Sequence, residues 1–227
     1  MTGILMPELV IYQTLENITK FIRDDLKKNA DREERTFLYR LLGLDDDGNP
    51  MKMNRYNYFK QAKKIFENAQ NLKANFGYNF EAAKIICFHI ILPAEQPAGS
   101  SIGEDEGYQT DYGDGGEVQL KFTQMFQANY QIMITSDNNS EVNVVYHIYK
   151  SLLLALVEHL SLRGLLNPSF SGNDIVFQDD TIPSGIFHRV LNLHFTYELT
   201  VPQLLFRDLI NSIHFDGTPI DVTPNED

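Results

Sequence analysis

Six histidines and one cysteine are the side chains of this 227-residue chain that suit metal binding or nucleophilic catalysis. His188, His194 and Glu198 lie on one side of a predicted strand, where about 3.3 Å per residue separates His194 from Glu198 by about 13 Å. Metal ligands lie within about 2 Å of one ion, so these side chains cannot share a site. His147 and His159 are about 18 Å apart along a predicted helix, at ~1.5 Å per residue. We therefore expect surface or hydrogen-bonded histidines and no metal.

Other catalytic patterns are also incomplete. Cys87 lies in an apolar run, which predicts a small buried side chain and not a nucleophile. Phe170-Ser171-Gly172 is not a nucleophile elbow, and the glycines at 113–116 have acidic neighbours that would repel phosphate. The segment 45–50 spaces three oxygen side chains as a calcium loop does, but it has proline where such a loop needs glycine. The sequence predicts no enzyme and no cofactor.

Charge is distributed unevenly along the chain, which has a net charge of −12. Residues 1–75 hold 13 Lys and Arg against 11 Asp and Glu, whereas residues 76–227 hold 6 against 20. The acidic part would repel nucleic acid. A single cysteine excludes an intramolecular disulfide and fits a reducing compartment. The chain has neither a basic, apolar start nor a long apolar run, so we expect no signal peptide and no membrane span.

The remaining elements would be arranged around the stretch 130–163. Tyr130–Ser136 is typical of a strand, residues 137–140 are a polar turn with capping side chains, and Glu141–Arg163 follows as one long helix that Gly164 ends. The helix is apolar on nearly all sides, apart from one narrow polar stripe. We therefore expect it to be buried on several sides.

The periodicity of the rest of the chain alternates between helix and strand. It predicts helices at 8–29, 31–42 and 54–75, and strands at 82–92, 118–126, 174–178 and 189–201. We expect an α+β fold with a mostly antiparallel sheet packed on the long buried helix. A helical segment, 1–75, would precede the α+β core, 76–205, and a tail, 206–227, would follow it.

An acidic loop at 93–117 interrupts the predicted core. It has six glycines, seven acidic residues and no Lys or Arg, so we expect it to be exposed. One interpretation is a surface insertion without a binding role. The other is a loop that orders on a partner or projects into a passage for DNA. Its candidate residues are Glu104, Asp105, Glu106, Asp111, Asp114 and Glu117.

The order of elements in residues 82–201 resembles the tail-terminator and tail-completion (neck) proteins of tailed bacteriophages. The strand Tyr130–Ser136, the helix Glu141–Arg163, the short strand Asp174–Gln178 and the long strand Arg189–Val201 carry this resemblance. The segment 31–75 and the loop 93–117 look larger than a minimal family member would carry. The amino-acid composition, rich in Asn and Tyr, also suggests a crAss-like gut phage as the source.

The resemblance implies a virion protein, assembled in the cytoplasm of a bacterial host. It would form a homo-oligomeric ring at the head–tail junction, contact portal, neck or tail proteins, and leave a channel for genomic DNA without sequence-specific binding. The long helix carries the side chains that we expect to pack against a neighbouring subunit: Tyr146, Tyr149, Leu153, Leu156 and Leu160.

Two further hypotheses remain open. The chain could be a non-catalytic adaptor that recruits a basic partner through the loop 93–117. It could also be a hydrolase whose metal is held between elements, for example by His147 and His194. Oligomeric state, deletion of the loop and metal content would distinguish the three.

Overall fold

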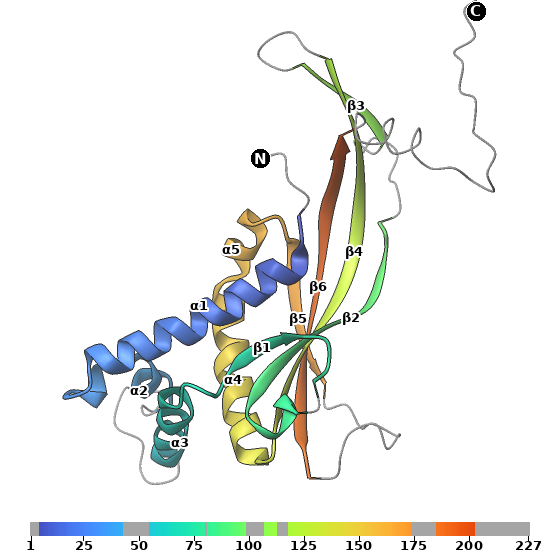
Figure 1. The fold of residues 1–227 in the computed structure, drawn as a ribbon. Helices are drawn as coiled ribbons and strands as arrows, with labels where there is room; N and C mark the ends of the chain where they lie inside the picture. The colour runs from blue at the N-terminus through green and yellow to red at the C-terminus, as the bar shows by residue number, and fades with distance from the viewer. Residues whose placement is uncertain are drawn as a thin grey trace, which may run out of the picture. The chain divides into compact units, whose positions relative to one another are not determined.

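The computed structural model describes residues 5–42, 55–79, 81–98, 107–112, 118–173 and 185–202 (Figure 1). The chain divides into two compact units. One comprises residues 6–96 and 127–197, and the other comprises residues 1–5, 97–126 and 198–227. The predicted boundary at residue 75 does not coincide with this division, because the amino-terminal helices share a unit with much of the sheet.

The described residues form a six-stranded sheet with strand order β1-β2-β4-β6-β5, in which β3 pairs with β4. The strands are β1 Lys73–Phe76, β2 Cys87–Pro97, β3 Gly107–Tyr112, β4 Val118–Ser136, β5 Leu166–Asn173 and β6 Phe187–Pro202. β1 pairs with β2 in parallel, whereas β3 with β4 and β5 with β6 are antiparallel. The mostly antiparallel α+β fold is therefore confirmed.

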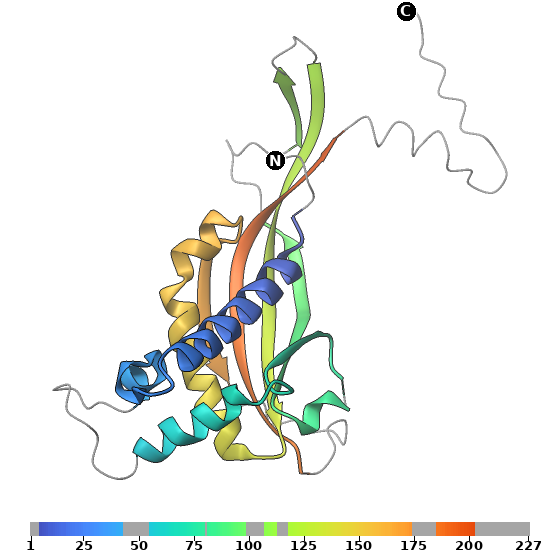
Figure 2. The ribbon, with the colours of Figure 1, turned by 60° about the vertical axis from the view of Figure 1, so that its left-hand side comes forward.

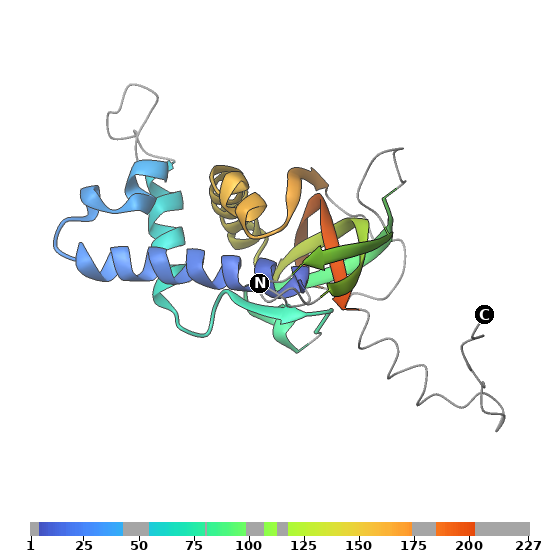
Figure 3. The same cartoon turned by 90° about the horizontal axis from the view of Figure 1, so that it is seen from above.

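Helices cover one face of this sheet. They are α1 Pro7–Lys28, α2 Phe37–Leu42, α3 Arg55–Glu67, α4 Asn139–Ala155 and α5 Val157–Leu162, with short 3-10 turns at Glu33–Arg35 and Ala82–Lys84. Figures 2 and 3 show α1 and α4 side by side on that face. None of the helices in the described ranges has both the length and the apolarity needed to cross a bilayer.

Tyr149 of α4 joins three other elements in the core and has no exposed surface. Its ring lies 4.5 Å from that of Phe88 in β2 and 6.2 Å from that of Phe66 in α3. Its hydroxyl is 2.5 Å from that of Thr19 in α1. Because the Thr19 hydroxyl also donates to the Leu15 carbonyl, the Tyr149 hydroxyl can donate to Thr19, and both groups are satisfied without water.

Two tyrosine–carboxylate pairs hold the start of α1 and the edge of β2 against the central strands. The Tyr130 hydroxyl donates to Glu8 of α1 at 2.7 Å, and the Tyr197 hydroxyl donates to Glu95 of β2. The Tyr130 ring stacks on Phe195 at 5.5 Å. Burial, and then the bonded carboxylates, raise the pKa of both tyrosines, so both hydroxyls keep their protons at neutral pH.

The side chain of Arg23 in α1 binds the backbone at the carboxy-terminal end of α3. Its guanidinium donates to the carbonyl of Phe66 in the last turn of α3 and to those of Asn68 and Asn71 in the segment that follows, at 2.9–3.0 Å. Leu72 then takes a left-handed conformation, φ 62°, and its N–H bonds to the Ile86 carbonyl. The chain thereby turns from α3 into β1.

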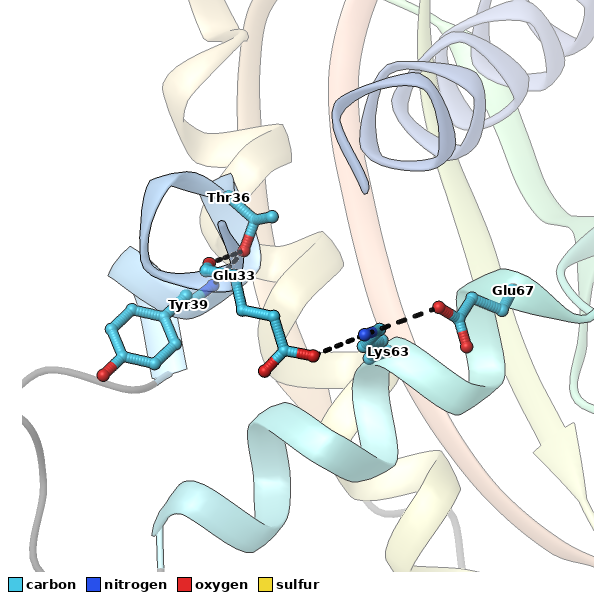
Figure 4. Close-up of polar contacts among 5 residues, drawn as sticks. All are labelled: Glu33, Thr36, Tyr39, Lys63 and Glu67. Atoms are coloured by element: carbon cyan, nitrogen blue, oxygen red, sulfur yellow. Dashed lines mark hydrogen bonds and ion pairs between the residues drawn. The ribbon is translucent and has the colours of Figure 1, made fainter. Parts of the chain in front are cut away.

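Side chains around α2 and α3 fix the outer part of the helical layer (Figure 4). The ammonium of Lys63 lies 2.5 Å from a carboxylate oxygen of Glu33 and 3.8 Å from one of Glu67. The Thr36 hydroxyl donates to the Glu33 carbonyl and accepts the Tyr39 N–H, which caps the first turn of α2.

Several predicted helix boundaries were wrong. The helix predicted at 54–75 ends at Glu67, and β1 follows. The helix predicted at 31–42 is a 3-10 turn followed by the short α2. The helix predicted at 141–163 is interrupted at Leu156, which separates α4 from α5. The Asn138 cap and the left-handed Gly164 (φ 95°) are where the sequence placed them.

The strand predictions also need correction. The strands predicted at 118–126 and 130–136 are one 19-residue strand, β4. The strand predicted at 82–92 begins at Cys87 and continues to Pro97, so the segment 93–117 contains the end of β2 and also β3. β5 occupies residues predicted as loop, and the strand predicted at 174–178 lies outside the described residues. The long strand predicted at 189–201 is confirmed as β6. Its residues Val190–Leu193 are all buried, and buried and accessible side chains alternate from Leu193 to Glu198.

Candidate subunit interface

One buried cluster of side chains resembles a catalytic group, and the sequence analysis did not predict it. The Cys87 sulfur lies 3.3 Å from His89 Nε2, and the Thr135 hydroxyl lies 3.0 Å from the same nitrogen. Burial raises the pKa of the thiol and lowers that of the imidazole, so the two groups meet as a neutral pair. None of the three side chains is more than 3% exposed. This geometry does not suit nucleophilic attack, which needs a thiolate that substrate can reach.

The histidines considered as metal ligands do not converge. His147 lies on α4 beside Arg189, whose guanidinium is 3.5 Å from its Nε2 and also lies over the Tyr146 ring. Burial, then Arg189 and Lys150, lower the pKa of His147. His194 is next to Phe195 in β6, so the side chains of these two residues lie on opposite faces of the sheet. Among the residues that the structure describes, no three His, Cys, Asp or Glu side chains could hold a metal ion.

The acidic candidates fall almost entirely outside the described ranges. This holds for Glu104, Asp105, Glu106, Asp114 and Glu117. Asp111 is part of β3, where its Cα pairs with that of Gln119 in β4. A role for the segment in binding a partner stays a prediction.

The five residues of the long helix that were predicted to contact a neighbouring subunit divide into two groups. Tyr146, Tyr149, Leu153 and Leu160 are buried within the chain itself, at most 6% exposed. Leu156 is half-buried. Four of the five side chains are therefore occupied by the core in this conformation, and Leu156 is the one that remains accessible to a neighbour.

The second half of the α4–α5 region has exposed apolar side chains, whereas the first half has none. Leu154 is 49% exposed and Leu162 is 87% exposed, whereas every apolar side chain between Val142 and Tyr149 is buried. The interruption at Leu156 lies between these exposed residues. Its N–H bonds to the carbonyls of both Leu152 and Leu153, which tightens the turn before α5 begins.

An apolar groove of about 320 Å³ lies between α1 and this end of α4. α1 contributes Thr14, Ile18 and Phe21. The other wall includes Leu152, Ala155 and Leu156. Thr14 and Ile18 form a buried floor, and Phe21 is 53% exposed at the rim. A groove of this size and composition accepts one or more large apolar side chains.

Hydrogen bonds link α1 to α4 and to the residue that follows α5. The hydroxyls of Thr19 in α1 and Tyr149 in α4 are 2.5 Å apart. At the far end, the Arg163 guanidinium donates to the Gln13 side chain at 2.8 Å. The Thr14 hydroxyl donates to the Val10 carbonyl at 2.7 Å, so the floor holds a methyl group and no unsatisfied hydroxyl. The groove is therefore suited to apolar side chains.

A larger hollow of about 460 Å³ lies near the start of α4 and is lined by both polar and apolar side chains. Lys64 and Lys84 line it together with Asp137 and Glu141. Opposite charges in equal number give this hollow no clear preference for one sign of ligand. The apolar groove is the better-defined candidate surface.

Comparison with protein-family models and with curated proteins finds no match to this sequence.

Proposed function

We propose that this chain is a structural subunit that assembles with copies of itself into a ring at the head–tail junction of a tailed bacteriophage. The observation that carries the proposal is the accessible apolar groove between α1 and α4–α5. Large exposed apolar surfaces mark sites of association. A ring arises when one surface of a subunit meets a different surface of the next and the rotation closes.

Two other features support the neck as the location. Residues 130–202 run from strand to helices to two paired strands, an order similar to that of the predicted elements that suggested the tail-terminator type, with the short strand at Leu166–Asn173. The net charge of −12 would keep passing DNA from adhering to a channel wall. The partners would be copies of this chain and the adjoining portal, neck or tail proteins.

The test compares two neighbouring substitutions in the full chain. Ala155→Glu places a charge in the groove without removing any large side chain, and Leu154→Glu is the control because Leu154 is exposed but does not line the groove. We expect rings of the wild type and of Leu154→Glu in electron micrographs and native mass spectra, and monomers of Ala155→Glu.

A wild-type chain that stays monomeric at the highest attainable concentration would contradict the proposal. So would equal assembly of Ala155→Glu and the wild type, because the groove would then have no part in association. At a concentration low enough for the wild type to be monomeric, the unfolding midpoints of both variants should match that of the wild type, which separates loss of assembly from loss of folding.

A further inference from the structure

The groove needs an apolar occupant that the described residues of its own chain do not supply. The Thr14 hydroxyl on its floor already has a partner, because it donates to the Val10 carbonyl. The polar side chains that line it, Asn17 and His159, are exposed. An amphipathic segment with an apolar face and a polar back would match this pattern of lining.

The chain carries such a segment after its last described strand. β6 ends at Pro202, and 25 residues follow, 203–227. In them, apolar residues recur at the i, i+3, i+4, i+7 spacing of one helix face: Phe206, Leu209, Ile210 and Ile213. The intervening positions include Arg207, Asp208, Asn211 and Ser212. This is the spacing with which a helix binds in a groove between other helices.

We propose that the groove between α1 and α4–α5 binds residues 206–213 of a neighbouring copy of this chain. The inference rests on the proposed ring, because it assigns the two unlike surfaces that a closed ring requires. One is the groove, and the other is the donated carboxy-terminal segment. Each copy gives one segment and receives one, so every groove is filled once the ring closes.

The first test is disulfide capture in the full chain. Ala155→Cys and Ile210→Cys are made as separate variants, one with a tag that changes its mass, and are assembled together and oxidised. Cys87 is buried and stays in place. We expect a covalent dimer of one tagged and one untagged chain, and no dimer when Leu154→Cys replaces Ala155→Cys.

The double variant Ala155→Cys with Ile210→Cys decides whether the segment crosses between copies. Bonds that link successive chains support the proposal. A bond closed within one chain would overturn it, since the occupant would then be the chain's own segment. Rings without any disulfide would overturn this inference and leave the proposed ring intact, whereas a monomeric wild type would contradict both.

A second test needs no engineered cysteine. Ile213→Glu should weaken assembly by about tenfold or more, because losing the burial of one large apolar side chain corresponds to at least that factor. Asn211→Glu, on the polar side of the same pattern, is the matched control and should assemble as the wild type does. Equal effects of the two substitutions would contradict docking through the apolar face.

Discussion

The two ends of the α4–α5 region have similar composition and different surroundings. Between Val142 and Tyr149 the apolar side chains pack against strands and other helices, and all are buried. The stretch from Leu152 to Leu162 is also rich in apolar residues, but Leu154, Ala155 and Leu162 are exposed. Apolar composition alone therefore does not distinguish a core from a surface that binds a partner. The two ends differ in how many neighbouring strands and helices cover them.

Tyr149→Ala should have the largest effect on stability, because it removes the side chain that joins α1, α3, α4 and β2. Truncating a buried aromatic residue costs about 3–5 kcal/mol. The measurement is the free energy of unfolding from urea titration. A loss below about 1 kcal/mol would contradict the assignment of this end of the helix to the core.

Gly172→Ala tests how closely β5 approaches the buried end of α4. A Cβ at this position would lie 1.7 Å from the Tyr146 hydroxyl oxygen, so the ring or the strand must shift. We expect a destabilisation of about 1–3 kcal/mol, as for other overpacked sites. The same substitution should cost less in a Tyr146→Phe background, and equal costs in the two backgrounds would show that the hydroxyl does not set the distance.

Stability at alkaline pH tests the burial of Tyr149 in another way. Burial raises the pKa of its hydroxyl above the ordinary 10.0. The native state therefore keeps this proton at pH values where the unfolded chain loses it. The contribution of Tyr149 to the free energy of unfolding is complete below pH 10. Above pH 10 it falls by about 1.4 kcal/mol per pH unit. Tyr149→Phe should make the decline of the unfolding free energy with pH shallower by that amount. Part of the decline should remain, because the pKa values of Tyr130 and Tyr197 are also raised. Identical slopes would contradict this prediction.

Leu154→Ala should have the smallest effect. Its side chain is half exposed and does not line the groove, so the unfolding free energy should change by no more than about 0.5 kcal/mol. A loss comparable with that of Tyr149→Ala would show that the two ends of the region do not differ as described.

The sequence predicted those elements whose signal is local. α1 follows its apolar period from end to end, and β6 occupies the residues of the predicted strand, with burial alternating from Leu193 to Glu198. α3 was predicted too long because its period continues through Leu72. The actual end depends on Arg23, more than 40 residues earlier, whose guanidinium binds the terminal carbonyls. A single-sequence pattern carries no such contact.

The candidate interface could be predicted only in part. The excess of apolar residues on the helix was visible, and Leu156 was among the residues chosen. Tyr146 and Tyr149 were chosen for the same reason, although partners from distant segments bury them, such as Gly172 and Thr19. Helical periodicity identifies the faces of a helix but not how many neighbours cover each face. Phe21 was not singled out because it belongs to another helix, and only the packing of α1 beside α4 brings it to the groove.

The position of β6 between β4 and β5 has a consequence for synthesis on the ribosome. β6 is the last of the described strands to be made, yet it lies in the interior of the sheet order. While α4, α5 and β5 are emerging, β4 has an open edge and β5 has no partner in the sheet. Such unpaired edges are prone to aggregation and attract chaperones. A nascent chain that stops before Phe187 thus lacks the strand that joins the two parts of the sheet, and native packing of α4 must wait for β6.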